Sequence, residues 1–333
     1  MKLSYRTRCA LKGAGKAALV LLVVAALAYG LWFSWLNRFV VYSREKGASL
    51  DFSFSITDRT GIAAEKPEET PPVSVFYNDG QYEVESEELS KLKGYYVTSA
   101  QLENDLEGVL AKLQELPKGT AVMIDVKSPK GNLFYSSAIR ENRALGIDPE
   151  AMDELIETVN SAGLYTIARL PAFKDRAYGV EYPMQTMQTA SGYGWDDNGY
   201  YWISPGKTQV QEYVTQLALE LRGLGFREVV FTEFRFPDTN KIVFSGDKKQ
   251  TLIDVAQTIM KTCTTDRFTV SFEDGGFGFP EGKCRIYAQN ITAANVESYV
   301  EKFQKENPEA SFVFVTELHD TRYEQYGVLR PLK

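Results

Sequence analysis

The run Ala121-Val-Met-Ile-Asp-Val126 is followed by an amphipathic stretch and then by a second apolar run, Leu164-Tyr-Thr-Ile-Ala-Arg-Leu170. Both runs are short and apolar on both faces, which is typical of strands in a sheet covered by helices. The stretch between them begins with Asp148, a capping side chain, and Pro149, a first-turn residue, and Gly163 follows its end. Strand, helix and strand in this order predict two parallel strands joined by a crossover helix.

The same alternation extends over the rest of the chain from Gly94 onward. Further strands are expected over residues 95–98, 228–235, 268–272, 284–288 and 311–316, and further helices over 102–116, 207–222, 248–262 and 293–306. About 240 residues of this kind suit a TIM-type (β/α)8 barrel, whose usual size is roughly 250 residues, and an open, doubly wound α/β sheet is the alternative. No Gly-x-Gly-x-x-Gly follows the first strand, so a dinucleotide site is not expected.

One connection departs from a regular barrel. The segment between the strands expected at 268–272 and 284–288 is too short for a crossover helix. Either this β/α unit is degenerate, or the two strands are not sequential parallel neighbours.

The composition limits the available chemistry. Lys and Arg total 37 against 44 Asp and Glu, which gives a net charge of −7 over 333 residues. Such an acidic surface is a poor partner for nucleic acid. One histidine and three cysteines are too few for a histidine-rich zinc site or a disulfide scaffold of this size. We therefore expect no cofactor, no metal site and no nucleic-acid partner.

Residues 17–36 read AALVLLVVAALAYGLWFSWL and contain no charged side chain. At about 1.5 Å per residue, a helix of this length matches the roughly 30 Å hydrocarbon core of a bilayer. Residues 1–16 are basic and lack acids, so the positive-inside rule places them in the cytoplasm and the bulk of the chain outside. We expect a single-pass anchor in the cell membrane. A cleaved signal peptide, with Ala26-Leu27-Ala28 as the cleavage box, is the alternative.

Residues 37–93 show no helical period and are expected to form an extracytoplasmic stalk ahead of a barrel domain at 94–333. Residues 51–56 alternate like a short strand, and residues 65–72 form a charged, proline-rich linker. One hairpin of the stalk could pack on the main domain. In the barrel domain, Cys263 and Cys284 could form a disulfide only if their Cα atoms come within bridging range.

Polar side chains gather near the C-terminal ends of the expected strands, which is the end where barrel active sites lie. These residues are Asp125, Lys127, Arg169, Glu233, Arg235, Glu273, Gln289 and Glu317. Alternation along a strand predicts that Asp125 and Lys127 share one face, and that Glu233 continues the face of Val229 and Phe231. Buried charges must pair or be solvated. A structural ring of ion pairs would satisfy them, but their recurrence on several strands favours a functional site.

A long loop over residues 174–206 follows the third expected strand and is rich in tyrosine and tryptophan. Loops of this length inside a compact domain are usually functional. Aromatic faces beside short polar side chains suit a sugar, whose C–H faces can stack on the rings. We expect Trp195 and Trp202 to stack on carbohydrate, with the alternative that the loop packs its aromatic rings beneath itself.

Three strand-end motifs resemble a known family. Phe231-Thr-Glu-Phe-Arg-Phe-Pro237 resembles its F-D-Y-x-R-F-P motif, and Val122-Met-Ile-Asp-Val-Lys127 resembles its V-I-D-V-K motif. Gly163-Leu-Tyr-Thr-Ile-Ala-Arg-Leu-Pro-Ala-Phe-Lys-Asp175 resembles its G-I-Y-x-I-A-R-x-x-x-F-K-D motif. The motifs occur in order, and the likeness covers roughly residues 94–290. The family is the glycosyl hydrolase domain family of bacterial TIM-barrel proteins, and the resemblance implies a glycosidase-like barrel, often in envelope proteins.

One position departs from the family pattern. The family's Asp on the fourth strand falls on Thr232 here, and Glu233 replaces its aromatic neighbour. A small register shift such as a bulge would let Glu233 take the place of that Asp. Without such a shift, the chain would be a pseudoenzyme of the same fold that binds carbohydrate or a protein.

We therefore expect a membrane-anchored, extracytoplasmic glycoside hydrolase that acts on an envelope or environmental polysaccharide through a pair of carboxyl groups. The expected catalytic residues are Glu233, Glu273 and Asp125. The expected substrate-binding residues are Lys127, Arg169, Arg235, Trp195, Trp202 and Gln289. The residues leave open the sugar, the linkage and whether the anomeric configuration is retained or inverted.

Overall fold

The computed structural model describes residues 21–33, 35, 40–43, 47–50, 89–140 and 146–333. The chain divides into two compact units, Met1–Tyr82 and Glu83–Lys333. The expected basic head at 1–16 and the expected stalk strand at 51–56 lie outside the described residues.

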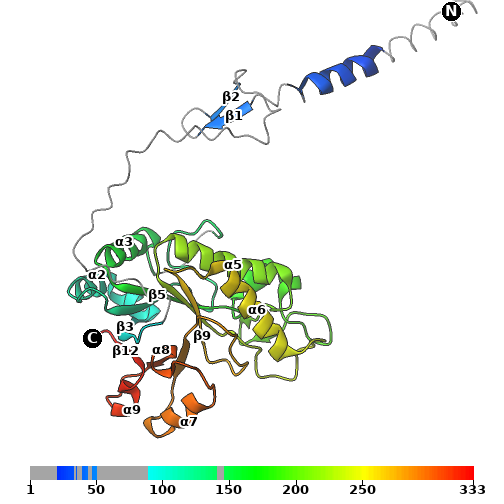
Figure 1. Cartoon of the computed structure of the whole chain (residues 1–333). Coiled ribbons are helices and arrows are strands. Elements are labelled where there is room, and N and C mark those ends of the chain that lie inside the picture. The colour runs from blue at the N-terminus through cyan, green and yellow to red at the C-terminus, as the bar shows by residue number, and fades with distance from the viewer. Residues whose placement is uncertain (1–20, 34, 36–39, 44–46, 51–88, 141–145) are drawn as a thin grey trace, which may run out of the picture. The chain divides into compact units, whose positions relative to one another are not determined.

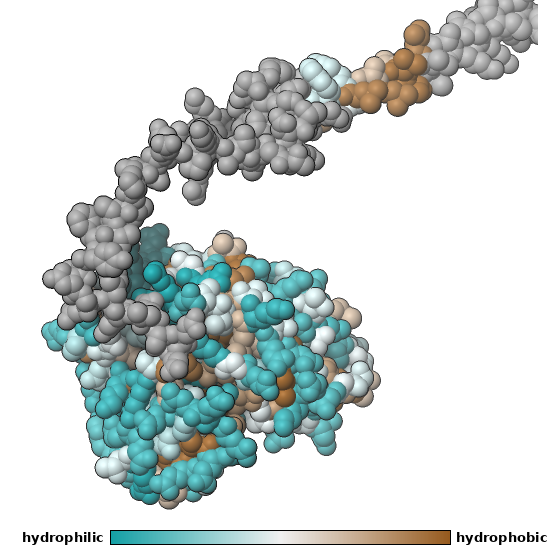
Figure 2. Space-filling view, in the orientation of Figure 1, coloured by the Kyte–Doolittle hydropathy of each residue, from teal (hydrophilic) through white to brown (hydrophobic). Residues whose placement is uncertain are grey.

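The first unit contains a helix over residues 21–33 and an antiparallel hairpin formed by β1 (Val40–Ser43) and β2 (Gly47–Leu50). Figure 2 shows that the helix is largely hydrophobic. Within the described ranges, no helix combines the length and the apolar character that a membrane span requires. Residues 17–20, 34 and 36 of the expected anchor lie outside those ranges, so the anchor stays a prediction.

The second unit is a closed barrel of parallel strands, as predicted, and the open-sheet alternative is wrong (Figure 1). Around the barrel the strands follow sequence order: β3 (Lys93–Val97), β4 (Ala121–Asp125), β5 (Tyr165–Pro171), β8 (Glu228–Thr232), β9 (Thr269–Glu273), β10 (Ile286–Gln289), β11 (Phe312–Val315) and β12 (Gly327–Pro331). Strand β12 closes the ring by pairing with β3, which places Val328 opposite Lys93.

The long helices lie outside the strands (Figure 1). They are α2 (Ser99–Gln114), α3 (Pro149–Ser161), α5 (Thr208–Gly223) and α6 (Lys248–Cys263). Thr98 and Gln101 form a capping box at α2, and Asp148 caps α3 by accepting a hydrogen bond from the Glu150 N–H. Each of these helices buries an apolar stripe, which accounts for the helical periodicity of the sequence.

The β/α unit between β9 and β10 is degenerate. These strands pair in parallel, and the residues that connect them contain no helix. The helix expected at 293–306 is shorter than predicted, because only η4 (Ala293–Asn295) and α7 (Val296–Glu301) form there. Two further short helices, α8 (Pro308–Ser311) and α9 (Thr321–Glu324), complete the C-terminal part. Cys263 and Cys284 are both buried free thiols, so no disulfide joins them.

Strand β5 shows how the barrel interior is layered. Ile167 lies in the apolar cluster that fills the centre of the barrel, with Tyr165 and Arg169 two residues before and after it on the same face. At the N-terminal end, the Tyr165 hydroxyl donates to the Glu228 carboxylate at 2.9 Å, and the buried Arg285 guanidinium donates to the same carboxylate at 2.5 Å. This buried ion pair lies at the end of the barrel formed by the N-terminal ends of the strands. The polar groups at the C-terminal ends of the strands lie at the opposite end of the barrel.

Candidate active site

A cavity of about 340 Å³ opens at the C-terminal ends of β4, β5, β8 and β9. We call it the mouth pocket, and it is lined by Ser99, Asp125, Lys127, Ser128, Pro129, Arg169, Pro171, Thr232, Glu233, Arg235, Glu273, Asp274 and Gly275. It includes all three carboxylates that the sequence analysis selected as catalytic, and three of the expected binding residues. Its volume is at the lower end of the usual range for small-ligand pockets, about 300–1,000 Å³.

One arginine joins two of the carboxylates. Asp125 and Arg169 lie opposite each other where β4 pairs with β5, and Arg169 donates to Asp125 Oδ1 at 2.9 Å. The second guanidinium nitrogen of Arg169 lies 3.7 Å from Glu273 Oε2. The backbone N–H of Ser99, at the start of α2, donates to the other oxygen of Asp125 at 3.0 Å. Asp125 is therefore held by two neighbouring elements, β5 and α2, whereas the contact of Arg169 with Glu273 is longer.

The third carboxylate reaches the pocket through an unusual backbone conformation. Val229 and Phe231 face the surrounding helices, so the strict alternation expected for this strand would turn Glu233 toward the helices as well. Strand β8 ends at Thr232, and Glu233 then adopts a φ of 49°, in the left-handed region that non-glycine residues rarely occupy. This turn breaks the alternation and brings Glu233 to the pocket beside Thr232. Such a conformation costs about 1–3 kcal/mol and is found most often at functional sites.

Arg235 binds Glu233 through two of its nitrogens. Its Nε donates to Glu233 Oε2 at 2.9 Å, and one terminal nitrogen lies 2.8 Å from the same oxygen. The Arg235 guanidinium also lies 5.0 Å from the centre of the Trp202 ring. Trp202 thus supports Arg235, which in turn orients Glu233.

Glu273 is the carboxyl group whose environment favours the protonated form. Burial raises its pKa above the ordinary value of 4.5, the Arg169 guanidinium opposes this, and the charges of Glu233 and Asp125 raise it further. A carboxyl group that keeps its proton closer to neutral pH can act as a general acid.

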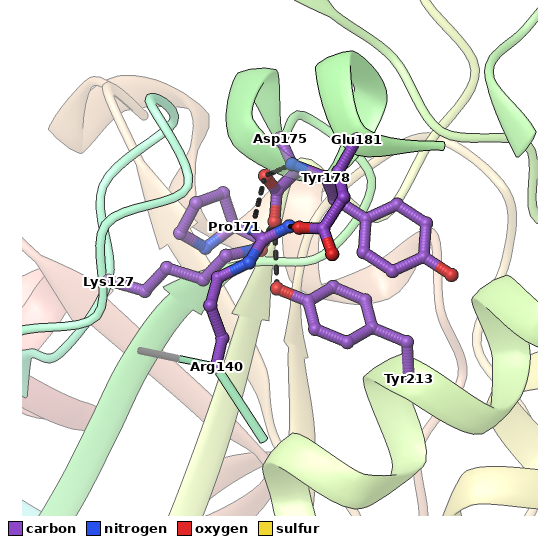
Figure 3. A network of polar contacts seen from close by, with 7 residues as sticks. All are labelled: Lys127, Arg140, Pro171, Asp175, Tyr178, Glu181 and Tyr213. Atoms are coloured by element: carbon purple, nitrogen blue, oxygen red, sulfur yellow. Dashed lines mark hydrogen bonds and ion pairs between the residues drawn. The ribbon is translucent and has the colours of Figure 1, made fainter. Parts of the chain in front are cut away.

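The structure corrects the expected role of Lys127. Lys127 lies beyond the end of β4, where strand alternation no longer applies, and its side chain is 0% exposed. Its ammonium group lies 2.8 Å from Asp175 Oδ2 and donates to the Pro171 carbonyl at 2.9 Å (Figure 3). The positive charge of Lys127 is therefore neutralised by Asp175 inside the protein. Lys127 supports the pocket wall, and its ammonium group is not available to a ligand.

The stacking role expected for Trp202 is also wrong. Trp202 is only 1% exposed, and its Nε1–H donates to Asp197 Oδ2 at 3.0 Å. Its ring is therefore covered by protein and cannot stack on a sugar. Trp195 is half-buried against the main apolar cluster, and Gln289 is half-buried at the end of β10; neither lines the mouth pocket.

The aromatic loop over residues 174–206 has both buried and exposed rings. Tyr178 and Trp202 are buried, so part of the loop does pack its rings beneath itself, whereas Tyr182 and Tyr193 are exposed. Glu317, the remaining strand-end acid, is exposed and does not line the pocket.

Several lining residues were not selected from the sequence. The most informative is Asp274, which accepts a hydrogen bond from the Tyr299 hydroxyl at 3.0 Å and another from the Gly276 N–H at 2.9 Å. Its position directly after Glu273 at a strand end was the available signal. In the part of the chain that the structure describes, no group of three or more His, Cys, Asp or Glu side chains is arranged to hold a metal ion.

Comparison with known proteins gives one family match. A family model described as "Putative glycosyl hydrolase domain" matches residues 94–274, which contain β3, β4, β5, β8 and β9 and therefore the three carboxylates. None of the curated proteins compared with this chain matches it.

Several solved structures are similar. The α-galactosidase AgaA of family GH36 from Geobacillus stearothermophilus, in complex with raffinose, aligns with a TM-score of 0.50 at 10% identity, over 74% of this chain and 39% of that one. A hypothetical protein from Ruminiclostridium thermocellum aligns with a TM-score of 0.46 at 21% identity, over 53% of this chain and 96% of that one. The glycoside hydrolase domain of PelA from Pseudomonas aeruginosa aligns with a TM-score of 0.45 at 10% identity, over 73% and 95%. At 10% identity, the likeness to AgaA concerns the fold alone.

Proposed function

Because the chain belongs to the glycosyl hydrolase domain family, we propose that it hydrolyses a glycosidic bond with a pair of carboxyl groups in the mouth pocket. The observation that carries this proposal is the convergence of Asp125, Glu233 and Glu273 from three strand ends on one cavity. Their different partners support different roles, as a carboxyl pair of this kind requires.

In this proposal Glu273 is the general acid. Its raised pKa favours a proton that it can donate to the oxygen of the departing sugar. Glu233, held by Arg235, is the second carboxylate, and it either attacks the anomeric carbon or deprotonates the attacking water. Asp125 and Arg169 act beside Glu273 and balance the charge that changes there during the reaction.

The test is a hydrolysis screen with matched variants. Wild-type protein is incubated with a panel of neutral and charged polysaccharides, and the release of reducing sugar is measured. We expect Glu273→Gln and Glu233→Gln each to lose about 10²-fold or more of the rate on the substrate found. Glu281→Gln serves as the control, because this exposed glutamate lies outside the mouth pocket. Full activity in both pocket variants would contradict the proposal.

We also propose that residues 17–36 anchor the protein in the cell membrane with its barrel outside the cytoplasm. Support comes from the uncharged apolar run and from the basic residues 1–16 that precede it. The substrate would then be a polysaccharide of the envelope or the surroundings. Resistance to alkaline extraction and digestion of the barrel by protease added outside intact cells would support this placement. Recovery in the soluble cytoplasmic fraction would contradict it.

One observation favours a second function, carbohydrate binding without turnover. Thr232 is the residue of β8 at the pocket, and it occupies the position where the family resemblance places an Asp. A hydroxyl group there cannot act as a carboxylate base. If the protein binds glycans but releases no reducing sugar from them, while Thr232→Asp gains activity, the binding function is the correct one.

A further inference from the structure

A second and larger hollow adjoins the mouth pocket. We call it the side groove; its volume is about 1300 Å³, and it shares Ser99, Ser128 and Pro129 with the mouth pocket. Its walls come from α2, the loop after β4, α4 (Arg176–Glu181) and α5. This volume exceeds the usual range for a small-ligand pocket, about 300–1,000 Å³, whereas that of the mouth pocket is near its lower limit.

We propose that the side groove binds several further units of an uncharged oligosaccharide whose end unit occupies the mouth pocket. This inference rests on the proposed function, because it assumes that the mouth pocket takes a sugar. It adds a substrate class: a neutral polymer held along the groove, in preference to a small glycoside or a polyanion.

The wall between the two cavities is held in place by its backbone. The Arg176 and Ala177 N–H groups donate to the Pro129 and Lys130 carbonyls at 3.1 and 3.0 Å. Gly131 has a φ of 86°, and a Cβ at this position would lie 2.1 Å from Asp175 Oδ1. The loop after β4 therefore packs directly on the start of α4, and a ligand can pass over a fixed edge at Pro129. A preformed path lowers the entropic cost of binding.

A network of polar contacts, drawn in Figure 3, borders the groove through Arg140, Tyr178, Glu181 and Tyr213. The Tyr213 hydroxyl, from α5, donates to Asp175 Oδ2 at 2.9 Å, the oxygen that also pairs with Lys127. The Arg140 guanidinium lies near the rings of Tyr178 and Tyr213 and donates to Glu181 Oε2 at 2.9 Å. These contacts fix the polar groups that border the groove before any ligand arrives.

The charge of the lining favours an uncharged ligand. Three cations and three anions line the groove, namely Lys130, Arg140, Arg176, Glu103, Glu181 and Glu212. A polyanion would meet as many repulsive as attractive groups, whereas sugar hydroxyls can pair with either sign. The groove also offers the aromatic ring of Tyr182, which is 44% exposed, and amide groups such as Gln209 and Gln216. Exposed rings beside hydrogen-bonding groups suit the two kinds of surface that a sugar presents.

The experiment measures binding separately from turnover. The whole chain carrying Glu273→Gln is titrated with neutral glucan, xylan, mannan, galactan and chitin oligosaccharides of two to six units. For the series that binds, we expect affinity to rise at least about tenfold between two and five units. Tyr182→Ala should lower the affinity for the five-unit ligand about tenfold while barely changing that for two units, and Tyr182→Phe should restore it. Tyr193→Ala is the control, because this tyrosine is 76% exposed and lies outside both cavities.

The outcomes separate the groove from the hydrolase. Length-dependent binding that Tyr182→Ala weakens would support the groove even if the wild-type chain cleaves nothing. Hydrolysis of small glycosides with no length dependence would overturn the groove while leaving the proposed hydrolase in place. Binding of none of the neutral series, or tighter binding of polyuronate of equal length, would overturn the groove and its ligand class.

Discussion

Replacing Asp175 by Asn removes the central carboxylate of the polar network that borders the side groove. Asp175 and Lys127 are 0% exposed at their side chains, and their charged atoms lie 2.8 Å apart. The Asp175 carboxylate also accepts hydrogen bonds from the Tyr178 N–H and the Tyr213 hydroxyl at 2.8 and 2.9 Å. Every one of these partners is a donor, so the NH₂ group of the introduced amide would face at least one donor and leave the Lys127 ammonium without its counter-charge.

Breaking a fully buried ion pair by removing one partner costs about 3–5 kcal/mol. Such a loss is a large part of the roughly 5–15 kcal/mol by which a domain is stable. Lys127→Met should cost less than Asp175→Asn, because Asp175 would keep its two hydrogen bonds and Arg140, 3.5 Å away. The double variant should be at least about 1 kcal/mol more stable than the sum of the single losses predicts, because the groups are in contact.

The assay is urea unfolding followed by circular dichroism, with Asp320→Asn as the matched control. Asp175 is the N-cap of α4, and Asp320 is likewise the N-cap of α9. Asp320 also forms an ion pair, at 2.8 Å from Arg322, but that pair is partly exposed. Since Asn caps helices about as well as Asp, the comparison isolates burial, and the control should lose much less stability than Asp175→Asn. Equal losses for both Asp→Asn variants, or strictly additive losses in the cycle, would refute the reasoning.

The pH dependence gives an independent check on Asp175. Burial raises the pKa of this carboxyl group, but the Lys127 ammonium and the Tyr178 N–H lower it more, and the net pKa lies below 3.8. The contribution of Asp175 is therefore present above pH 3.8 and is lost as the pH falls through the lower, folded-state pKa. The stability difference between wild type and Asp175→Asn should shrink in this acidic range.

Three other predictions concern the mouth pocket and the barrel. The pKa of Glu273 is raised above 4.5, so the free energy of unfolding should fall as the pH rises from 4.5 through that higher pKa. Urea unfolding at several pH values should show this fall in the wild type and not in Glu273→Gln. Glu233→Gly should be about 1 kcal/mol more stable than Glu233→Ala, because both lack the carboxylate but only glycine adopts a φ of 49° without strain; equal melting temperatures would contradict this. Gly94→Ala should destabilise the barrel by about 3 kcal/mol or more, because the added Cβ would lie 1.8 Å from the Ala121 carbonyl oxygen. Gly223→Ala is the control: a Cβ at Gly223 would meet open space, so this variant should have a melting temperature close to that of the wild type.

The barrel could be predicted from the sequence because its signals are local. Apolar runs, helix caps such as Asp148 and glycines such as Gly163 determine strands and helices within a few residues. The last strand, Gly327–Pro331, gave no comparable signal, because it is short and its place is set by pairing with β11 and β3. Strand pairing across the barrel is a long-range property that periodicity does not contain.

The pocket residues could be predicted as a set, but their individual orientations could not. Alternation predicts a side chain's face only while the strand continues, and β4 and β8 end at Asp125 and Thr232. Beyond those points the Lys127 side chain points inward and forms a buried ion pair with Asp175. The left-handed conformation of Glu233 directs its side chain toward the pocket. The sequence motif around Glu233 therefore indicated the strand end at which the pocket lies. The side of the strand to which the Glu233 side chain points was determined by the φ angle of that residue.

Burial of the aromatic loop could not be predicted from composition. A tryptophan in a polar, tyrosine-rich loop suits either a binding surface or a buried support, and only the packing around it decides. Trp202 is buried beneath Arg235 and contributes to the mouth pocket indirectly. The side groove was missed because its walls come from segments far apart in the chain, such as Ser99 and Tyr213.

The most direct test of the proposed chemistry compares leaving groups. Glu273→Gln should lose about 10²–10⁴-fold of kcat/KM on the polysaccharide, whose departing oxygen needs a proton. It should lose far less of kcat/KM on the matching dinitrophenyl glycoside, whose leaving group departs without a proton. Glu233→Gln should lose activity on both substrates, because it removes the group that attacks or activates water. Equal losses for Glu273→Gln on the two substrates, or wild-type rates in both variants, would contradict the assignment of Glu273 as the acid and Glu233 as its partner.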